Sequence, residues 1–227
     1  MKILKKLLKI LFNMIPSSKI YIFHHVSLNP KIDVSGCKLK TEDFYRFVKK
    51  YSKAVSIEEA LKGKIFPIGK SVYTFDDGIE DVYEIAYPYL KEKNIPFTVF
   101  ILTNKIDTPG YITTQQLLKM NEDSLITIGV HGTNHKILPQ ISKEEQEDEI
   151  INGKIILEKL LEKKIDIFAY SHGQYNKKTI EIVKRAGYKY AFSVRELHLN
   201  IFSKIFCYEI PRYNVDSMSI NNYNIEK

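Results

Sequence analysis

Short apolar segments alternate with amphipathic helical segments along almost the whole chain. The apolar segments are rich in branched and aromatic residues, end at turn residues, and cover 20–26, 71–75, 97–102, 125–130, 165–170, 190–194 and 209–215. Segments of this length and composition predict buried strands. Their alternation with helices over short connections predicts an α/β domain whose parallel sheet is either open or closed into a barrel. With 227 residues, of which 44% are hydrophobic, the chain can bury one full core.

The helices expected between these strands carry start and stop signals. Thr41 and Asn176 are expected helix caps, and Ser56 and Ser142 each open a capping box with the Glu three residues later. Pro88 predicts an irregularity inside a helix over 81–93. The second capping box predicts one long helix over 142–164, and a short strand is expected at Ala54–Val55.

Polar residues follow several of the predicted strands. Asp76 and Asp77 follow the strand at 71–75, His131 follows 125–130, and His172 follows 165–170. The carboxyl ends of parallel strands form one rim, where α/β domains place their chemistry, so we expect these side chains to lie together. His24 and His25 lie in the first strand and point to opposite faces, so only one of them can reach an interior site.

Two adjacent carboxylates and a pair of histidines suggest a metal centre on this rim. Asp76 and Asp77 repel each other unless a cation or strong donors are present, although Asp-Gly turn chemistry with Asp77 as a helix cap is the alternative. His131 and His135 would share one face of a helical turn and could bind one ion. Two nitrogens and one oxygen leave positions open for water and substrate.

This ligand set suits more than one metal and more than one chemistry. Zinc is the default for nitrogen and oxygen ligands, and nickel, cobalt or iron would fit the same residues. A non-haem iron oxygenase is the alternative for two histidines and one carboxylate. The alternation of strands and helices and the second Asp favour hydrolysis, in which a metal activates water and the free carboxylate takes its proton.

The charge of the chain excludes some partners and favours others. Lys and Arg number 34 against 27 Asp and Glu, which gives a net charge of +7, but the lysines are scattered rather than clustered in a stripe. We therefore expect no nucleic-acid partner, and attraction to an anionic membrane surface or glycan instead. Cys37 and Cys207 form no disulfide framework, which fits a reducing compartment.

Residues 1–18 are expected to form a segment separate from a single domain over 19–227. Residues 1–15 are too short to span a membrane and lack a cleavage site, and they predict a basic amphipathic helix on an anionic membrane surface. The alternatives are a helix packed on the domain itself and an uncleaved signal-anchor. We expect a cytoplasmic protein, peripheral on the inner face of the membrane in the first case. The basic face comprises Lys2, Lys5, Lys6 and Lys9.

Three motifs together resemble one enzyme family. TFDDG at 74–78, VHGTNH at 130–135 and FAYSHGQY at 168–175 resemble the polysaccharide deacetylase family, the NodB-homology carbohydrate esterases of family 4. The opening IFHHVS is similar to the branch that includes exopolysaccharide poly-N-acetylglucosamine deacetylases. The resemblance covers about residues 20–215 and implies a distorted (β/α)7–8 barrel of the NodB-homology type.

The resemblance also assigns roles to individual residues. It implies that Asp76 is the general base and that Asp77, His131 and His135 bind the metal ion. His24 aligns with the general acid that protonates the leaving amine, a task suited to an imidazole with a pKa of ~6.5. The alternative for His24 is a hydrogen-bonded core histidine.

The third motif departs from the family pattern, which is usually Pro-Tyr-Gly where this chain has Ser171-His172-Gly173. The backbone N–H of His172 is expected to stabilise the oxyanion, and its ring is a candidate third imidazole near the metal or a substrate contact. Tyr175 is assigned with it to the substrate side. The Arg that orients the base in other members is absent before this motif, and Arg212 is the expected replacement.

These observations predict a metal-dependent hydrolase that removes an N-acyl group, foremost N-acetyl, from an amino sugar of a bacterial surface polysaccharide or its precursor. The substrate is expected to be an N-acetylated glycan or a lipid- or nucleotide-linked sugar. Two alternatives remain at this stage. One is a catalytically altered glycan-binding or scaffold protein on the same fold, and the other is a peripheral membrane protein.

Overall fold

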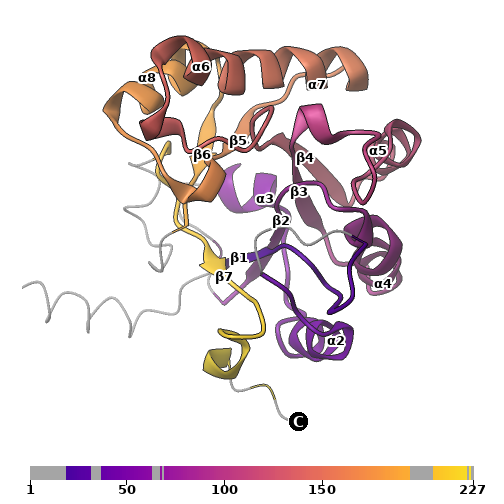
Figure 1. Ribbon diagram of the computed structural model, residues 1–227. Coiled ribbons are helices and arrows are strands. Elements are labelled where there is room, and N and C mark those ends of the chain that lie inside the picture. Colours follow the sequence, from indigo (N-terminus) through magenta and orange to yellow (C-terminus); the bar gives the residue numbers. More distant parts are fainter. Residues whose placement is uncertain are drawn as a thin grey trace, which may run out of the picture.

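A seven-stranded parallel sheet forms the centre of the protein, with helices around it (Figure 1). The computed structural model describes residues 19–31, 37–62, 67, 69–194, 207–223 and 225. The predicted helix at 1–15 lies outside these residues. The strand order is β6-β5-β4-β3-β2-β1-β7. The strands are β1 (Lys19–Phe23), β2 (Ser71–Phe75), β3 (Phe97–Ile101), β4 (Ile126–Val130), β5 (Ile167–Ala169), β6 (Tyr190–Phe192) and β7 (Tyr213–Asn214).

The segment before β7 connects the two edges of the sheet. Ile210 bridges Phe192 of β6, donating to the Ala191 carbonyl at 3.0 Å and accepting from Ser193 N at 2.8 Å. Three residues later β7 pairs with β1 at the opposite edge. The sheet is therefore a half-barrel spanned by this segment, and the predicted distorted barrel with seven strands is confirmed.

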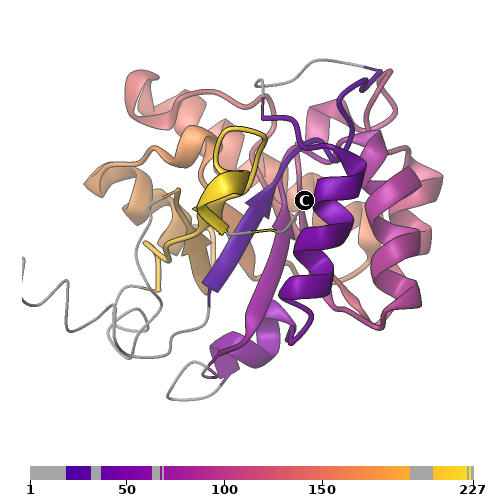
Figure 2. The ribbon, with the colours of Figure 1, turned by 90° about the horizontal axis from the view of Figure 1, so that it is seen from below.

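The two faces of the sheet bury different apolar clusters, as the two-residue period of a strand requires. The outer face packs under the surrounding helices (Figures 1 and 2) and includes Tyr21, Phe23, Tyr73, Phe75, Phe97, Val99 and Phe168. The inner face includes Ile20, Val72, Phe100, Ile167, Ala169 and Phe192. Ile57, Ala60 and Leu61 of α3 pack on the inner face, and Figure 1 shows this helix within the curve of the strands. The inner space is thus a packed core.

The helices largely follow the sequence signals. They are α2 (Thr41–Lys50), α3 (Ile57–Lys62), α4 (Tyr87–Glu92), α5 (Thr114–Asn121), α6 (Lys143–Glu147), α7 (Gly153–Leu161) and α8 (Lys177–Arg185). Ser142 and Asn176 form capping boxes. The expectation for Thr41 is wrong, because Lys40 is the N-cap of α2 and the Thr41 hydroxyl donates to the Val26 carbonyl instead. Ala54 forms only an isolated bridge to Ser71 rather than a strand.

Two helices that the sequence predicts as continuous contain a π-helical turn. In η1 (Val82–Ala86), Tyr87 N–H donates to the Val82 carbonyl five residues back, and Pro88 follows with no N–H to offer. The helix predicted over 142–164 is divided by η4 (Asp148–Asn152) into α6 and α7. The Tyr188 hydroxyl donates to the Ile150 carbonyl of η4 at 3.0 Å, which satisfies a group that the widened turn exposes.

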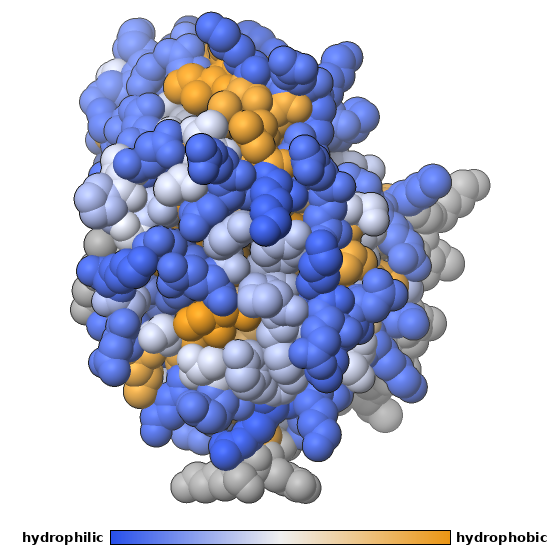
Figure 3. All heavy atoms as spheres, turned by 90° about the vertical axis from the view of Figure 1, so that its right-hand side faces the viewer, coloured by the Kyte–Doolittle hydropathy of each residue, from blue (hydrophilic) through white to orange (hydrophobic). Residues whose placement is uncertain are grey.

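The face that carries α4, α5 and α7 is mostly hydrophilic, with apolar areas between the polar side chains (Figure 3). Exposed apolar side chains on these helices include Leu118 of α5 and Ile155 and Ile156 of α7. Among the described residues, no helix has the length and apolar character needed to cross a membrane.

Gly129 tests the packing of the inner core. A Cβ at this position of β4 would lie 2.6 Å from the Phe100 ring and 2.8 Å from Ile167 Cγ1. We expect Gly129→Ala to lower the free energy of unfolding by about 1–3 kcal/mol, measured by urea denaturation. Combined with Phe100→Leu, which makes room, the loss should be smaller than the sum of the two single losses. Additive losses would contradict this account.

Candidate active site

The site lies at the carboxyl ends of the strands. Asp76 and Asp77 follow β2, and His131 follows β4. Asp77 and Gly78 both adopt left-handed backbone, with φ of 71° and 69°. A Cβ on Gly78 would lie 2.9 Å from Ile101 Cδ1, and the positive φ also favours glycine at this position beside β3. The turn places both carboxylates at the strand end, where they are buried.

Asp77, His131 and His135 form a compact group whose candidate ligand atoms all lie within 4.8 Å of one another. The Nε2 atoms of both histidines are 3.5 Å from Asp77 Oδ1. The histidines do not share a helical turn as expected, because Gly132 and His135 have φ of 102° and 63°. The intervening N–H groups of Thr133 and Asn134 donate to the Glu149 carboxylate rather than to a helix.

The atoms of this group fit a metal ion. Both carboxylate oxygens of Asp77 are buried without a hydrogen-bond partner among the described residues, a costly state for an anion. His131 Nδ1 lies 2.9 Å from the Ala169 carbonyl, which can only accept, so Nδ1 carries the proton and Nε2 presents a lone pair. One oxygen and two nitrogens that converge in this way suit zinc or a related divalent ion.

Asp76 has a different partner, the fully buried guanidinium of Arg212. Arg212 donates from its two terminal nitrogens to the two Asp76 oxygens at 2.7 Å each, in a bidentate pair. One of these nitrogens also lies 3.2 Å from Thr74 Oγ1. The guanidinium carbon is 5.0 Å from the centre of the Phe100 ring. Arg212 therefore lies beside Asp76, the residue for which the motif resemblance implies the role of base.

The two carboxylates differ in their titration because of these partners. Burial alone would raise the pKa of Asp76, but the charge and hydrogen bonds of Arg212 outweigh it and hold that pKa well below its usual range. Burial raises the pKa of Asp77 to about 6. Burial lowers the pKa of His131 to about 3 and lowers that of His135. Both imidazoles are therefore neutral at pH 7, as metal ligands must be.

His24 and His25 separate as expected, although β1 ends just before them at Phe23. His25 is buried, and its Nδ1 lies 3.0 Å from Asp81 Oδ2. His24 is half-buried and close enough to Asp76 and Asp77 to lower the pKa of both carboxylates against the effect of burial. Its Nδ1 has no hydrogen-bond partner in the described part of the chain, which does not fit the alternative of a hydrogen-bonded core histidine.

The third motif places His172 beside His135 and Tyr175 against Tyr170 and Glu209. His172 has φ of 56° in the short turn Ser171–Gly173, and its ring contacts that of His135 in a tilted arrangement, with the ring centres 4.3 Å apart. The His172 side chain is exposed at the rim and is not part of the Asp77-His131-His135 group. Tyr175 stacks on Tyr170 at 4.6 Å and donates to Glu209 at 2.8 Å.

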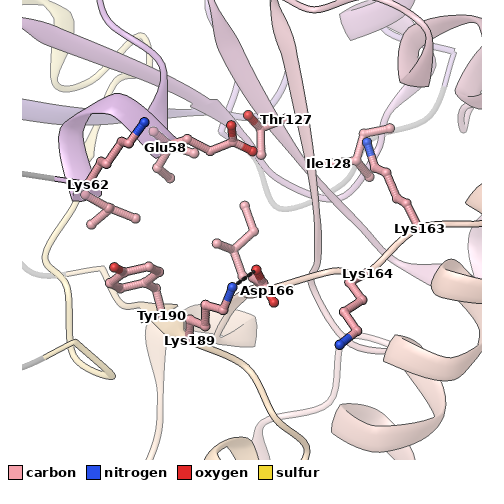
Figure 4. A pocket seen from close by; sticks show the side chains of 12 residues that line it. Glu58, Lys62, Thr127, Ile128, Lys163, Lys164, Asp166, Lys189 and Tyr190 are labelled. Atoms are coloured by element: carbon pink, nitrogen blue, oxygen red, sulfur yellow. Dashed lines mark hydrogen bonds and ion pairs between the residues drawn. The ribbon is translucent and has the colours of Figure 1, made fainter.

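A cavity of about 370 Å³ lies away from this chemistry, at the amino ends of β4, β5 and β6 (Figure 4). It is lined in part by Glu58 and Lys62 of α3, and by Lys189, which is 2.6 Å from Asp166. The strands are parallel, so this cavity is at the opposite end of the sheet from Asp76 and His131. It belongs to a different part of the molecule.

Comparison with known proteins identifies the class to which this fold and site belong. The family model for polysaccharide deacetylases matches residues 66–191, more than half of the chain and including both carboxylates and both histidines of the site. The chain belongs to the polysaccharide deacetylase family. The resemblance read from the three motifs is thereby confirmed.

Individual relatives come from two bacteria. The chain is 32% identical over 162 residues to a poly-beta-1,6-N-acetyl-D-glucosamine N-deacetylase of Staphylococcus aureus, in an alignment covering 64% of this chain and 56% of that protein. It is 29% identical over 116 residues to the Bacillus subtilis protein YxkH, covering 51% of this chain and 41% of that protein. The chain thus spans about half the length of these relatives.

Solved structures share the fold at lower identity. The deacetylase PplD of Streptococcus pyogenes, in complex with acetate, superposes with a TM-score of 0.78 at 23% identity and covers 94% of this chain and 100% of that one. IcaB from Ammonifex degensii superposes with a TM-score of 0.76 at 22% identity, covering 92% of this chain and 95% of that one. At this identity the likeness extends to the fold alone.

Arg212 and Asp76 form a pair whose loss can be measured. Arg212→Met leaves the Asp76 carboxylate buried without its cation, and we expect unfolding free energy to fall by about 3–5 kcal/mol. Arg212→Met combined with Asp76→Asn removes both charges and should lose markedly less than the sum of the two single variants in urea denaturation. Additivity would show that the two side chains do not stabilise each other.

Asp77 should destabilise the protein when metal is removed by a chelator. Its folded pKa of about 6 lies above the ordinary 3.8, so the stability that its proton contributes is present below pH 3.8 and lost as the pH rises through 6. Asp77→Asn should therefore raise unfolding free energy by about 1–3 kcal/mol at pH 7.5, with little gain at pH 4. Asp148→Asn, on an exposed side chain, is the control. An unchanged stability of Asp77→Asn at pH 7.5 would contradict the geometry.

Proposed function

We propose that the protein is a metal-dependent hydrolase that removes N-acetyl groups from amino sugars of a polysaccharide. The observation that carries this proposal is the pair of adjacent carboxylates with opposite environments. Asp76 is held ionised by Arg212, whereas both oxygens of Asp77 are orphaned beside two neutral imidazoles. This arrangement separates a base from a metal ligand, and membership of the polysaccharide deacetylase family supports the assignment.

Asp77, His131 and His135 would hold the metal ion. The ion would supply Lewis-acid chemistry, polarising the amide carbonyl and lowering the pKa of water from ~15.7 toward ~7. Asp76 Oδ2 lies 3.7 Å from His131 Nε2, which places the carboxylate beside the ligands, where it can accept a proton from an attacking water. Arg212 keeps Asp76 ionised and fixes its orientation through two hydrogen bonds.

Two further groups would complete the reaction. His24 approaches the carboxylates from β1 and is suited to donate a proton to the departing amine nitrogen. The backbone N–H of His172, in the turn after β5, is the candidate donor to the developing oxyanion. A backbone donor survives the replacement of the family's tyrosine by His172, so the altered motif is compatible with catalysis. The products would be an amino sugar and acetate.

The substrate class follows from the relatives. The Staphylococcus aureus relatives are named for poly-β-1,6-N-acetyl-D-glucosamine, and the opening motif of this chain is similar to the same branch. We propose an exopolysaccharide of N-acetylated hexosamine as the substrate of this chain. Zinc is the proposed metal, because the donor set of two nitrogens and one oxygen is the one it favours.

An amine-release assay tests this proposal. The protein loaded with Zn²⁺ is incubated with oligomers of β-1,6-N-acetylglucosamine, and free amine and acetate are measured together with the metal content. Asp77→Ala and His131→Ala should lose metal and activity together. Asp76→Asn should keep the metal and lose activity about 10²–10⁴-fold, since it removes the proposed base and leaves the three proposed metal ligands in place. Circular dichroism of each variant controls for folding.

The outcomes separate the proposed enzyme from the alternative of a glycan-binding protein that has lost catalysis. Bound metal together with release of acetate from N-acetylated oligomers supports the enzyme. Bound metal without release from any N-acetylated glycan in a panel would overturn it in favour of glycan binding, and full activity of Asp76→Asn would overturn the role of the base.

A further inference from the structure

Glu149 is a buried carboxylate that the proposed reaction does not use. It lies in the π-helical turn η4 and is 1% exposed. No Lys or Arg forms an ion pair with it in the described part of the chain, although burying an unpaired anion is costly. The sequence offers no signal for it, because four other acidic residues precede it between 144 and 148. The hydrogen-bond partners of Glu149 must therefore account for its burial.

All the hydrogen bonds recorded for Glu149 come from the segment between the two histidines. Thr133 N–H donates to Oε2 at 3.1 Å, and Thr133 Oγ1 donates to Oε1 at 2.9 Å. Asn134 N–H lies 3.1 Å from Oε1 and 3.0 Å from Oε2. One carboxylate thus receives three donors from two consecutive residues, which sets the path of the backbone from His131 to His135.

Two glycines, Gly132 and Gly153, leave room for the Glu149 carboxylate and its helix to lie close to the histidine segment. A Cβ on Gly132 would lie 2.6 Å from Glu149 Oε2, and a Cβ on Gly153 would lie 3.0 Å from Val130 Cγ1 and 3.4 Å from the Gly132 carbonyl carbon. Glycine at both positions allows η4 and α7 to press against the segment. The π turn itself is a form often found at functional sites, and it places Glu149 toward the sheet.

The other side of the segment is held by the short turn that follows β3. Thr103 N–H donates to the Gly132 carbonyl at 3.1 Å, and Asn104 N–H donates to the Thr133 carbonyl at 3.2 Å. The segment is therefore clamped between the loop after β3 and Glu149. Its non-helical geometry, including φ of 63° at His135, is the one that directs both Nε2 atoms at Asp77.

We propose that Glu149 is a positioning residue for the metal centre: its carboxylate holds the segment from His131 to His135 in the shape that binds the ion. The burial of the carboxylates supports this assignment. Asp76 is paired with Arg212, whereas no Lys or Arg ion pair is recorded for Asp77 or Glu149 among the described residues. The inference rests on the proposed metal site but assigns Glu149 no contact with metal or substrate.

Glu149→Gln tests the inference with little change in shape. The amide NH₂ group cannot accept from the N–H groups of Thr133 or Asn134, so the segment should lose part of the hydrogen bonds that hold it. We expect the affinity for Zn²⁺, measured by chelator competition on the full chain, to fall about 10–100-fold. The visible absorption spectrum of bound Co²⁺ should change as well, because the histidine geometry changes.

Two further variants make the test specific. Thr133→Val removes one donor and keeps the two backbone donors, and it should weaken Zn²⁺ affinity less than Glu149→Gln does. Glu147→Gln makes the same charge change two residues away, on a side chain that pairs with Arg185 and Lys143, and it should leave affinity and spectrum unchanged. Thr133→Val keeps the inference testable if Glu149→Gln folds poorly.

The outcomes distinguish this inference from the proposed function. Wild-type Zn²⁺ affinity and Co²⁺ spectra in both Glu149→Gln and Thr133→Val would overturn the role of Glu149 while leaving the metal site in place. A wild-type protein that binds neither ion would overturn the metal centre and the positioning role together. Equal losses in Glu149→Gln and Glu147→Gln would show a general charge effect and would also overturn it.

Discussion

The burial of two adjacent carboxylates at the end of β2 is the constraint on which the rest of the site depends. Neither can be ionised there without compensation. Asp76 obtains it from Arg212, whose guanidinium lies inside the half-barrel between the Asp76 oxygens and the Phe100 ring. Neither oxygen of Asp77 has a hydrogen-bond partner among the described residues. The protein thus stabilises the charge of Asp76 with its own guanidinium and leaves Asp77 available to the proposed metal ion.

The different environments of Asp76 and Asp77 depend on segments that are far apart in the chain. The segment from Cys207 to Asn214 pairs with β6 and then with β1, and so spans the gap between them. The same segment carries Arg212, whose side chain is fully buried. The histidine segment after β4 is held by Glu149 from a helix that approaches only because residues 132 and 153 are glycines. The fold therefore holds buried carboxylates in an arrangement suited to the proposed metal ion, although burying these charges is unfavourable. Such arrangements are common at functional sites.

Local patterns in the chain were enough for most of the elements and for the chemistry of the rim. The strands β2, β3 and β4 lie within a residue of their expected limits, because buried strands of a parallel sheet read as apolar runs. The capping boxes at Ser142 and Asn176 form because their hydrogen bonds lie within one turn. The helix expected over 142–164 forms over 143–161, but local patterns did not predict its π turn at η4, which Tyr188 and Glu149 stabilise through contacts with residues distant in sequence.

By itself, the amino-acid sequence determined the parallel α/β architecture, the rim at the strand ends, and the residues that meet there. Short-range periodicity and the direction of parallel strands are sufficient for these. The motif resemblance proposed Arg212 as the partner of Asp76 and His24 as the histidine of the site. Only the tertiary structure decided that Arg212 forms a bidentate pair with Asp76, that His25 pairs with Asp81, and that Glu149 binds the histidine segment. The partners in these pairs are 136, 56 and 15 residues apart, and no local pattern specifies which buried charge a distant side chain will meet.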